Sequence, residues 1–131
     1  MLNVRLMIVT ITFMCVAGLA GCGQSKPSAS DGEKFIKDKI TLISQGQIQL
    51  VSFEKTDGQS SEVMGVPLYR LEFTGEIEFL SDTPRFFYAP MKKGQHQKIT
   101  GGIKFAKTEN GWRESQAWVT GSDGYAYVSS Q

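Results

Sequence analysis

Residues 68–80 constrain the fold more than any other segment, because apolar and polar side chains alternate along them. The odd positions hold Tyr69, Leu71, Phe73, Gly75, Ile77 and Phe79, and the even interior positions hold Arg70, Glu72, Thr74, Glu76 and Glu78. A period of two predicts a strand of an antiparallel sheet with one buried face and one face in water. Gly75, in the middle, predicts a bulge or a bend.

A helix is expected before this strand. Ser30 or Asp31 can cap it, and Gly46 lies where it should end. The spacing of the apolar residues predicts a buried face made of Ile36, Ile40 and Ile43, widened by Phe35 and Leu42.

Three further strands are expected. Residues 48–56 are rich in strand-forming residues and end at the turn signal Asp57-Gly58. Residues 98–108 should turn Ile99, Ile103 and Phe105 inward. Asn110-Gly111 predicts a hairpin into residues 112–120, where a slip of one residue decides whether Trp118 or Ala117 and Val119 face the core. The fold class is therefore α+β: one N-terminal helix packed on a four-stranded antiparallel meander.

The first residues predict an export signal. Arg5 is the only charged residue in 1–21, and Leu6 to Ala20 is an uncharged run of 15 residues, short for a membrane-spanning helix. The run ends in Leu19-Ala20-Gly21-Cys22, which closely resembles the lipobox of bacterial lipoproteins. The resemblance implies that Cys22 receives a diacylglycerol, that the chain is cut just before it, and that the protein is lipid-anchored on the extracytoplasmic side of a bacterial cell membrane or outer membrane. The alternative is an ordinary signal peptide, with Cys22 left as a free or paired thiol.

Cysteine content agrees with lipidation. The chain has two cysteines, and Cys15 lies in the segment that would be removed, so Cys22 would have no intramolecular partner. The expected organisation is a signal peptide over 1–21, a lipidated cysteine and flexible tether over 22–30, and a single α+β domain over 31–131. The domain resembles small cystatin-like and NTF2-like domains of uncharacterised lipoproteins, through segments such as 53–59, 69–79 and 107–112. That resemblance implies no particular activity.

Charge and motifs narrow the function classes. Lys and Arg total 14 and Asp and Glu total 13, so no strong field favours nucleic acid as a partner. The single histidine, His96, is expected in a solvated loop, and no metal site or cofactor motif is recognised, so we expect neither a metal nor a cofactor. The row Glu72, Glu76 and Glu78 could act as an acid–base pair or hold Ca²⁺. The more economical interpretation is a solvated sheet face paired with Arg70, Lys98, Lys104 and Arg113.

Residues 81–98 are the most unusual part of the chain. Three consecutive rings, Phe86, Phe87 and Tyr88, cannot all point inward from an extended segment, and Arg85, Lys92 and Lys93 make the same loop basic. This pattern predicts a contact surface for a protein partner, a glycan or anionic lipid headgroups. The alternative is a long hairpin whose rings pack on the edge of the sheet.

The sequence thus predicts a lipid-anchored, non-enzymatic binding module of the bacterial envelope, with an envelope protein or a ligand as its partner. A structural or assembly component of an envelope complex is the second possibility. An enzyme is the third.

Overall fold

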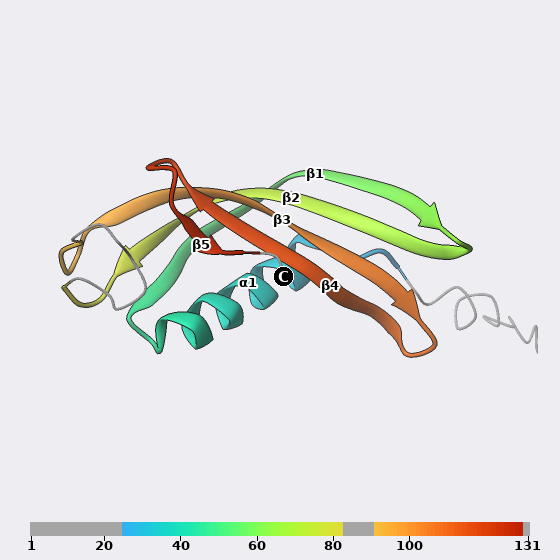
Figure 1. Ribbon diagram of the computed structural model, residues 1–131, viewed down its shortest axis with the longest axis horizontal. Coiled ribbons are helices and arrows are strands. Elements are labelled where there is room, and N and C mark those ends of the chain that lie inside the picture. Colours follow the sequence, from blue (N-terminus) through green and yellow to red (C-terminus); the bar gives the residue numbers. More distant parts are fainter. Residues whose placement is uncertain (1–24, 83–90, 130–131) are drawn as a thin grey trace, which may run out of the picture.

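The computed structural model describes residues 25–82 and 91–129. One helix, α1 (Ala29–Ser44), precedes five strands in chain order: β1 (Ile48–Val63), β2 (Val66–Phe79), β3 (His96–Thr108), β4 (Gly111–Gly121) and β5 (Ala126–Val128). The strands pair with their sequence neighbours, all antiparallel, in the order β1-β2-β3-β4-β5. The sheet is long and curved, and α1 lies against its concave face (Figure 1). The α+β class is confirmed, with five strands in place of four.

The core lies between α1 and this concave face. Ile36 and Ile40 of the helix are buried, as predicted. The alternation along β2 is confirmed, because Leu71, Phe73 and Ile77 are each at most 1 % exposed. The remaining buried apolar residues of the cluster are Ile48, Tyr69, Phe79, Met91, Ile99, Ile103, Phe105, Ala117, Val119, Tyr127 and Val128.

The helix begins earlier than predicted. Its N-cap is Ser28, whose hydroxyl accepts a hydrogen bond from the Asp31 backbone N–H, while the Asp31 carboxylate accepts one from the Ser28 backbone N–H. This reciprocal capping box places Asp31 inside the first turn, where a carboxylate also meets the positive end of the helix dipole. Pro27 is buried as well, and Ala29 and Ser30 already belong to the helix.

The helix ends where Gly46 predicts. Gln45 and Gly46 both have positive φ, 54° and 78°, and the Gly46 N–H donates to the Thr41 carbonyl. The predicted apolar face is too wide, because Leu42 is 76 % exposed and Ile43 is only partly buried.

The first strand is much longer than predicted, and the turn expected at Asp57-Gly58 is wrong. The chain remains paired with β2 through this region and turns at Met64-Gly65 instead, where φ is 51° and 82°. Two positive φ values make the tight two-residue turn that suits a twisted hairpin. The shifts in register place the bulges of this hairpin on β1, at Val51 and near Thr56. The bulge predicted at Gly75 therefore belongs to the neighbouring strand.

The β3–β4 hairpin resolves the register that the sequence left open. Thr108 pairs with Gly111, so Glu109 and Asn110 form the turn, one residue earlier than the Asn-Gly signal suggests. Ala117 and Val119 face the core, and Trp118 lies on the outer face of the sheet. Across the described residues, no helix is long and apolar enough to span a membrane.

Candidate functional site

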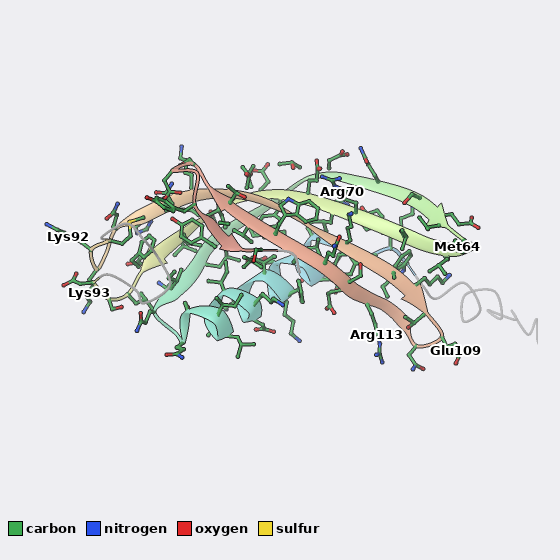
Figure 2. The ribbon with its side chains drawn as sticks, in the orientation of Figure 1. Met64, Arg70, Lys92, Lys93, Glu109 and Arg113 are labelled. Carbon is green, nitrogen blue, oxygen red and sulfur yellow. The ribbon has the colours of Figure 1, made fainter. Side chains whose placement is uncertain are left out.

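The predicted contact loop is described only in part. Cys22, Arg85, Phe86, Phe87 and Tyr88 lie outside the described residues. Lys92 and Lys93 are exposed at one end of the elongated molecule, where β2 leads toward β3 (Figure 2).

The chain on either side of this loop is well anchored. The Lys93 N–H donates to the Asp82 carboxylate at 2.9 Å, and the Met91 side chain is buried. The Gly94 N–H donates to the Phe79 carbonyl at 2.7 Å. These contacts join the two flanks of the loop to each other and to the end of the sheet.

The glutamates of β2 lie on the outer sheet face, as expected, with one expected partner, Arg70, and one that was not expected, His96. Glu72 pairs with Arg70 of its own strand at 2.8 Å. His96 begins β3 instead of lying in a loop, and its Nδ1 and Nε2 lie 3.3 Å from Glu76 and 3.9 Å from Glu78. Among the described residues, no ion pair within 4.0 Å joins this row to the other expected cations, Lys98, Lys104 and Arg113.

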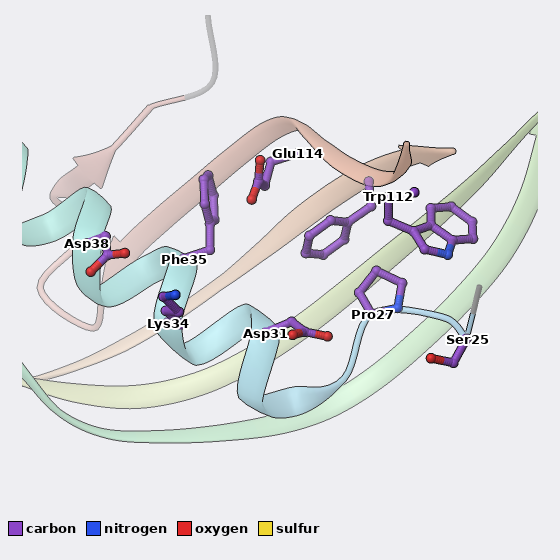
Figure 3. Close-up of a pocket in the computed structure, with 10 residues that line it drawn as sticks. Ser25, Pro27, Asp31, Lys34, Phe35, Asp38, Trp112 and Glu114 are labelled. Atoms are coloured by element: carbon purple, nitrogen blue, oxygen red, sulfur yellow. The ribbon is translucent and has the colours of Figure 1, made fainter. Parts of the chain in front are cut away.

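A cleft of about 440 Å³ opens elsewhere, between the start of α1 and the hairpin end of β3 and β4 (Figure 3). Helix α1, the segment before it and the β3–β4 hairpin all contribute to its walls. The lining residues are Ser25, Pro27, Asp31, Lys34, Phe35, Asp38, Phe105, Gly111, Trp112 and Glu114. This volume lies within the range of small-molecule sites, roughly 300–1,000 Å³.

Three aromatic rings give the cleft its apolar surface. Phe35 points from α1 toward the strand that carries Glu114, and Trp112 stands above Pro27 (Figure 3). Phe105 of β3 is the third ring of the lining and is buried. The ring of Trp112 packs edge to face against the ring of Tyr69, with 6.4 Å between the ring centroids.

One polar group in this wall lacks a partner. The indole Nε1 of Trp112 is shielded from water and makes no hydrogen bond within the part of the chain that the structure describes. A buried N–H donor without an acceptor is uncommon and carries a desolvation cost.

The charged residues of the lining are mostly acidic. Asp31, Asp38 and Glu114 oppose the single ammonium of Lys34. The hydrogen bond from the Ser28 backbone N–H, followed by that from the Ser28 hydroxyl, lowers the pKa of Asp31 below its usual value. This carboxylate is therefore charged at neutral pH, and the lining has a formal charge of −2.

Sequence reasoning missed this cleft because its walls come from three separate segments. The helical spacing predicted that Phe35 would lie on the buried face of the helix. The Asn-Gly signal predicted the hairpin turn that Trp112 follows. No local pattern connects the two. Across residues 25–82 and 91–129, no group of three or more His, Cys, Asp or Glu side chains could hold a metal ion. No family model matches the chain, and comparison with curated proteins and with solved structures gives no match either.

Proposed function

We propose that this chain is a lipid-anchored lipoprotein of the bacterial envelope that acts, on the extracytoplasmic side, as a non-enzymatic binding module. The observation that carries the binding role is the cleft at Trp112, which combines aromatic walls with excess negative charge. Pockets that orient a small ligand commonly have this composition.

The anchor rests on the tetrapeptide Leu19-Ala20-Gly21-Cys22 and on the short distance from it to the domain. Ser25 is the first described residue, and Pro27 is already packed in the domain. Three residue steps separate Cys22 from Ser25 and span at most about 11 Å. Diacylglycerol on Cys22 would supply two acyl chains, the number that stable anchoring requires. The domain would then lie close to the lipid surface.

The ligand class is argued from the walls of the cleft. Aromatic surfaces favour a flat or aliphatic group, and the negative lining favours a cation. A molecule that carries a protonated amine beside an apolar group would satisfy both features. A lysine-containing peptide segment and a small aryl amine both belong to this class.

Binding is tested with phenethylamine and with phenylacetate, which have a similar apolar group and opposite charge. Phenethylamine should perturb the amide signals of Phe35, Trp112 and Glu114 in NMR spectra, and phenylacetate should perturb them much less. Trp112→Phe should weaken the effect, whereas Trp118→Phe, on the outer face, should leave it unchanged. Equal responses to both probes, or none near the cleft, would refute the proposed ligand class.

The anchor is tested with Cys22→Ser. The wild-type chain should incorporate a clickable fatty acid and fractionate with membranes, and the variant should remain as precursor or appear as soluble protein. A wild-type chain that incorporates no label would overturn the anchor.

An assembly role is the second candidate, and one observation favours it. β1 is an edge strand of 16 residues whose only ladder partner in the described structure is β2. Such an edge can accept a strand from another protein. Its bulges, and charged residues such as Lys55 and Glu62, are features that discourage strand addition, so we rank this role second. Crosslinking through Lys55 into a stable multiprotein complex would favour it.

A further inference from the structure

We propose that the tip of the β1–β2 hairpin, residues 63–66, inserts into the surface of the membrane to which the chain is anchored. The inference rests on the proposed lipid anchor at Cys22. It adds a second, protein-mediated contact with the lipid.

The tip is apolar and open to solvent. Met64 is 98 % exposed, Val63 54 % and Val66 42 %, the largest group of exposed apolar side chains at one turn in the described chain. Pro67 and Leu68 extend the uncharged stretch, and Glu62 is the nearest charged residue on the preceding strand. Exposed apolar residues gathered at one place indicate a contact surface rather than a random surface composition.

The tip is also held in place. The pairing of β1 with β2 continues to Val63 and Val66, so the turn is an extension of the sheet rather than a long loop. A projecting hairpin of this kind presents its apolar residues without much loss of conformational freedom on contact. All residues from 59 to 67 are exposed, so the end of the hairpin stands clear of the core.

The position of the tip points to lipid as its partner. Met64 lies at the same end of the molecule as the Glu109 turn, and Lys92 and Lys93 lie at the opposite end (Figure 2). The described chain also enters at the Met64 end (Figure 1). Any lipid on Cys22 would therefore lie near the hairpin.

A direct contact links the entering chain to the hairpin. The Lys26 ammonium lies 5.9 Å from the centre of the Tyr69 ring on β2, and the Tyr69 hydroxyl is 2.7 Å from the Lys55 ammonium on β1. Lys26 is four residues after Cys22. The entering chain and β1 thus contact the same aromatic residue of β2.

The charge at this end determines how the contact should respond to lipid composition. At the two turns themselves the charges cancel, because Glu62 and Glu109 balance Lys107 and Arg113, and Lys26 and Lys55 lie further from the tip, beside Tyr69. Insertion of an apolar turn should therefore occur in uncharged lipid and should change little with salt.

The experiment uses the lipidated protein, whose Cys22 is blocked by acylation, with Met64→Cys labelled by an environment-sensitive dye. The protein is reconstituted in phosphatidylcholine vesicles, and mass spectrometry confirms the lipid. Glu109→Cys at the same end and Lys92→Cys at the opposite end carry the same dye as controls. We expect a blue shift at position 64, with loss of emission when nitroxide-labelled lipid acyl chains are added. Lys92→Cys should show neither effect, and Glu109→Cys a weaker one.

Several outcomes would overturn the inference. If the protein is lipidated but the dye at residue 64 shows no more blue shift or quenching than the dye at residue 92, membrane insertion is wrong and the anchor stands. If the protein carries no lipid, both the anchor and the insertion are wrong. Shielding of residue 64 in the soluble Cys22→Ser form that grows with protein concentration would identify a second copy as the partner. As a second variant, Met64→Asp should abolish the quenching of a dye at Val66→Cys; unchanged quenching would contradict the proposal.

Discussion

Gly102 and Trp118 face each other across β3 and β4, and the indole of Trp118 occupies the space that a Cβ at residue 102 would need. Arg70 of β2 covers the same indole, with its guanidinium 4.8 Å from the ring centre. The glycine thus allows an aromatic side chain to lie flat on the outer face of the sheet.

Gly102→Ala should therefore destabilise the protein by about 1–3 kcal/mol, because the added methyl group would push the ring away or bend the strand. Urea denaturation measures the loss. In a Trp118→Ala background the same substitution should cost much less, since the obstructing ring is gone. An equal cost in both backgrounds would place the strain elsewhere in the backbone.

The two faces of β2 should differ sharply in their contribution to stability. Phe73 is 1 % exposed and stacks on Phe53 with 4.6 Å between centroids, so Phe73→Ala should cost about 3–5 kcal/mol. Glu76 lies on the outer face beside His96, and Glu76→Ala should cost less than about 1 kcal/mol. Chemical denaturation of the two variants measures both losses in the free energy of unfolding. Similar losses would mean that the outer face is covered as well.

The fold could be predicted where side-chain periodicity was strong. The alternation along β2 placed Leu71, Phe73 and Ile77 in the core, and the spacing of Ile36 and Ile40 located the helix and its buried face. Each of these signals is local, and each agrees with the tertiary structure.

The features that the sequence did not predict depend on contacts between segments that are distant in the chain. Asp57-Gly58 has the composition of a turn, but pairing with β2 keeps it extended, and the Asp57 carboxylate accepts the Gly58 N–H within the strand. β5 has only three residues, too few for a detectable period, and is held by the buried Tyr127 and Val128. The cleft could not be predicted for the same reason, since its walls meet only after the sheet has curved around α1.

The helix cap should make stability depend on acidity. Asp31 has a lowered pKa because it accepts hydrogen bonds from the Ser28 backbone and hydroxyl, so the folded state favours its charged form. The stabilisation is present above the ordinary pKa of 3.8 and is lost as pH falls below it. Asp31→Asn should therefore differ most from wild type at neutral pH and least in acid. Thermal melts across this range test the dependence, and a constant difference would contradict it.

The Ser28 hydroxyl is the other half of the capping box, and its removal should lower stability without changing the charge of the protein. Ser28→Ala takes away the hydroxyl that accepts the Asp31 N–H and should cost about 1 kcal/mol at neutral pH. Ser30→Ala, which changes a neighbouring exposed serine inside the helix, is the matched control and should cost little or slightly stabilise. Equal effects of the two substitutions would show that the capping box contributes nothing.

The aromatic loop gives the last prediction. Replacement of Phe86, Phe87 and Tyr88 by serine should leave the fold largely intact and abolish contact with a partner. Three consecutive rings cannot all face inward from an extended segment, and exposed rings beside cations favour binding. The flanks remain joined by the bond between Lys93 and Asp82 and by the buried Met91, which these substitutions leave in place. Lys92 and Lys93, which follow the rings in the sequence, lie at the end of the described structure opposite the entering chain (Figure 2).

Thermal melts and crosslinking from membranes test the triple variant together. Lys92→Ala with Lys93→Ala is the matched control for the cations of the same loop and should weaken partner contact without lowering the melting temperature. A triple variant that loses as much stability as Phe73→Ala would show that the rings pack against the sheet. A triple variant that folds and retains every crosslink of the wild type would place the partner surface elsewhere. The outer face with Glu72, Glu76 and Glu78 would be the next region to test, because the contacts of these glutamates with Arg70 and His96 are partly exposed and can be exchanged for contacts with a partner's charges.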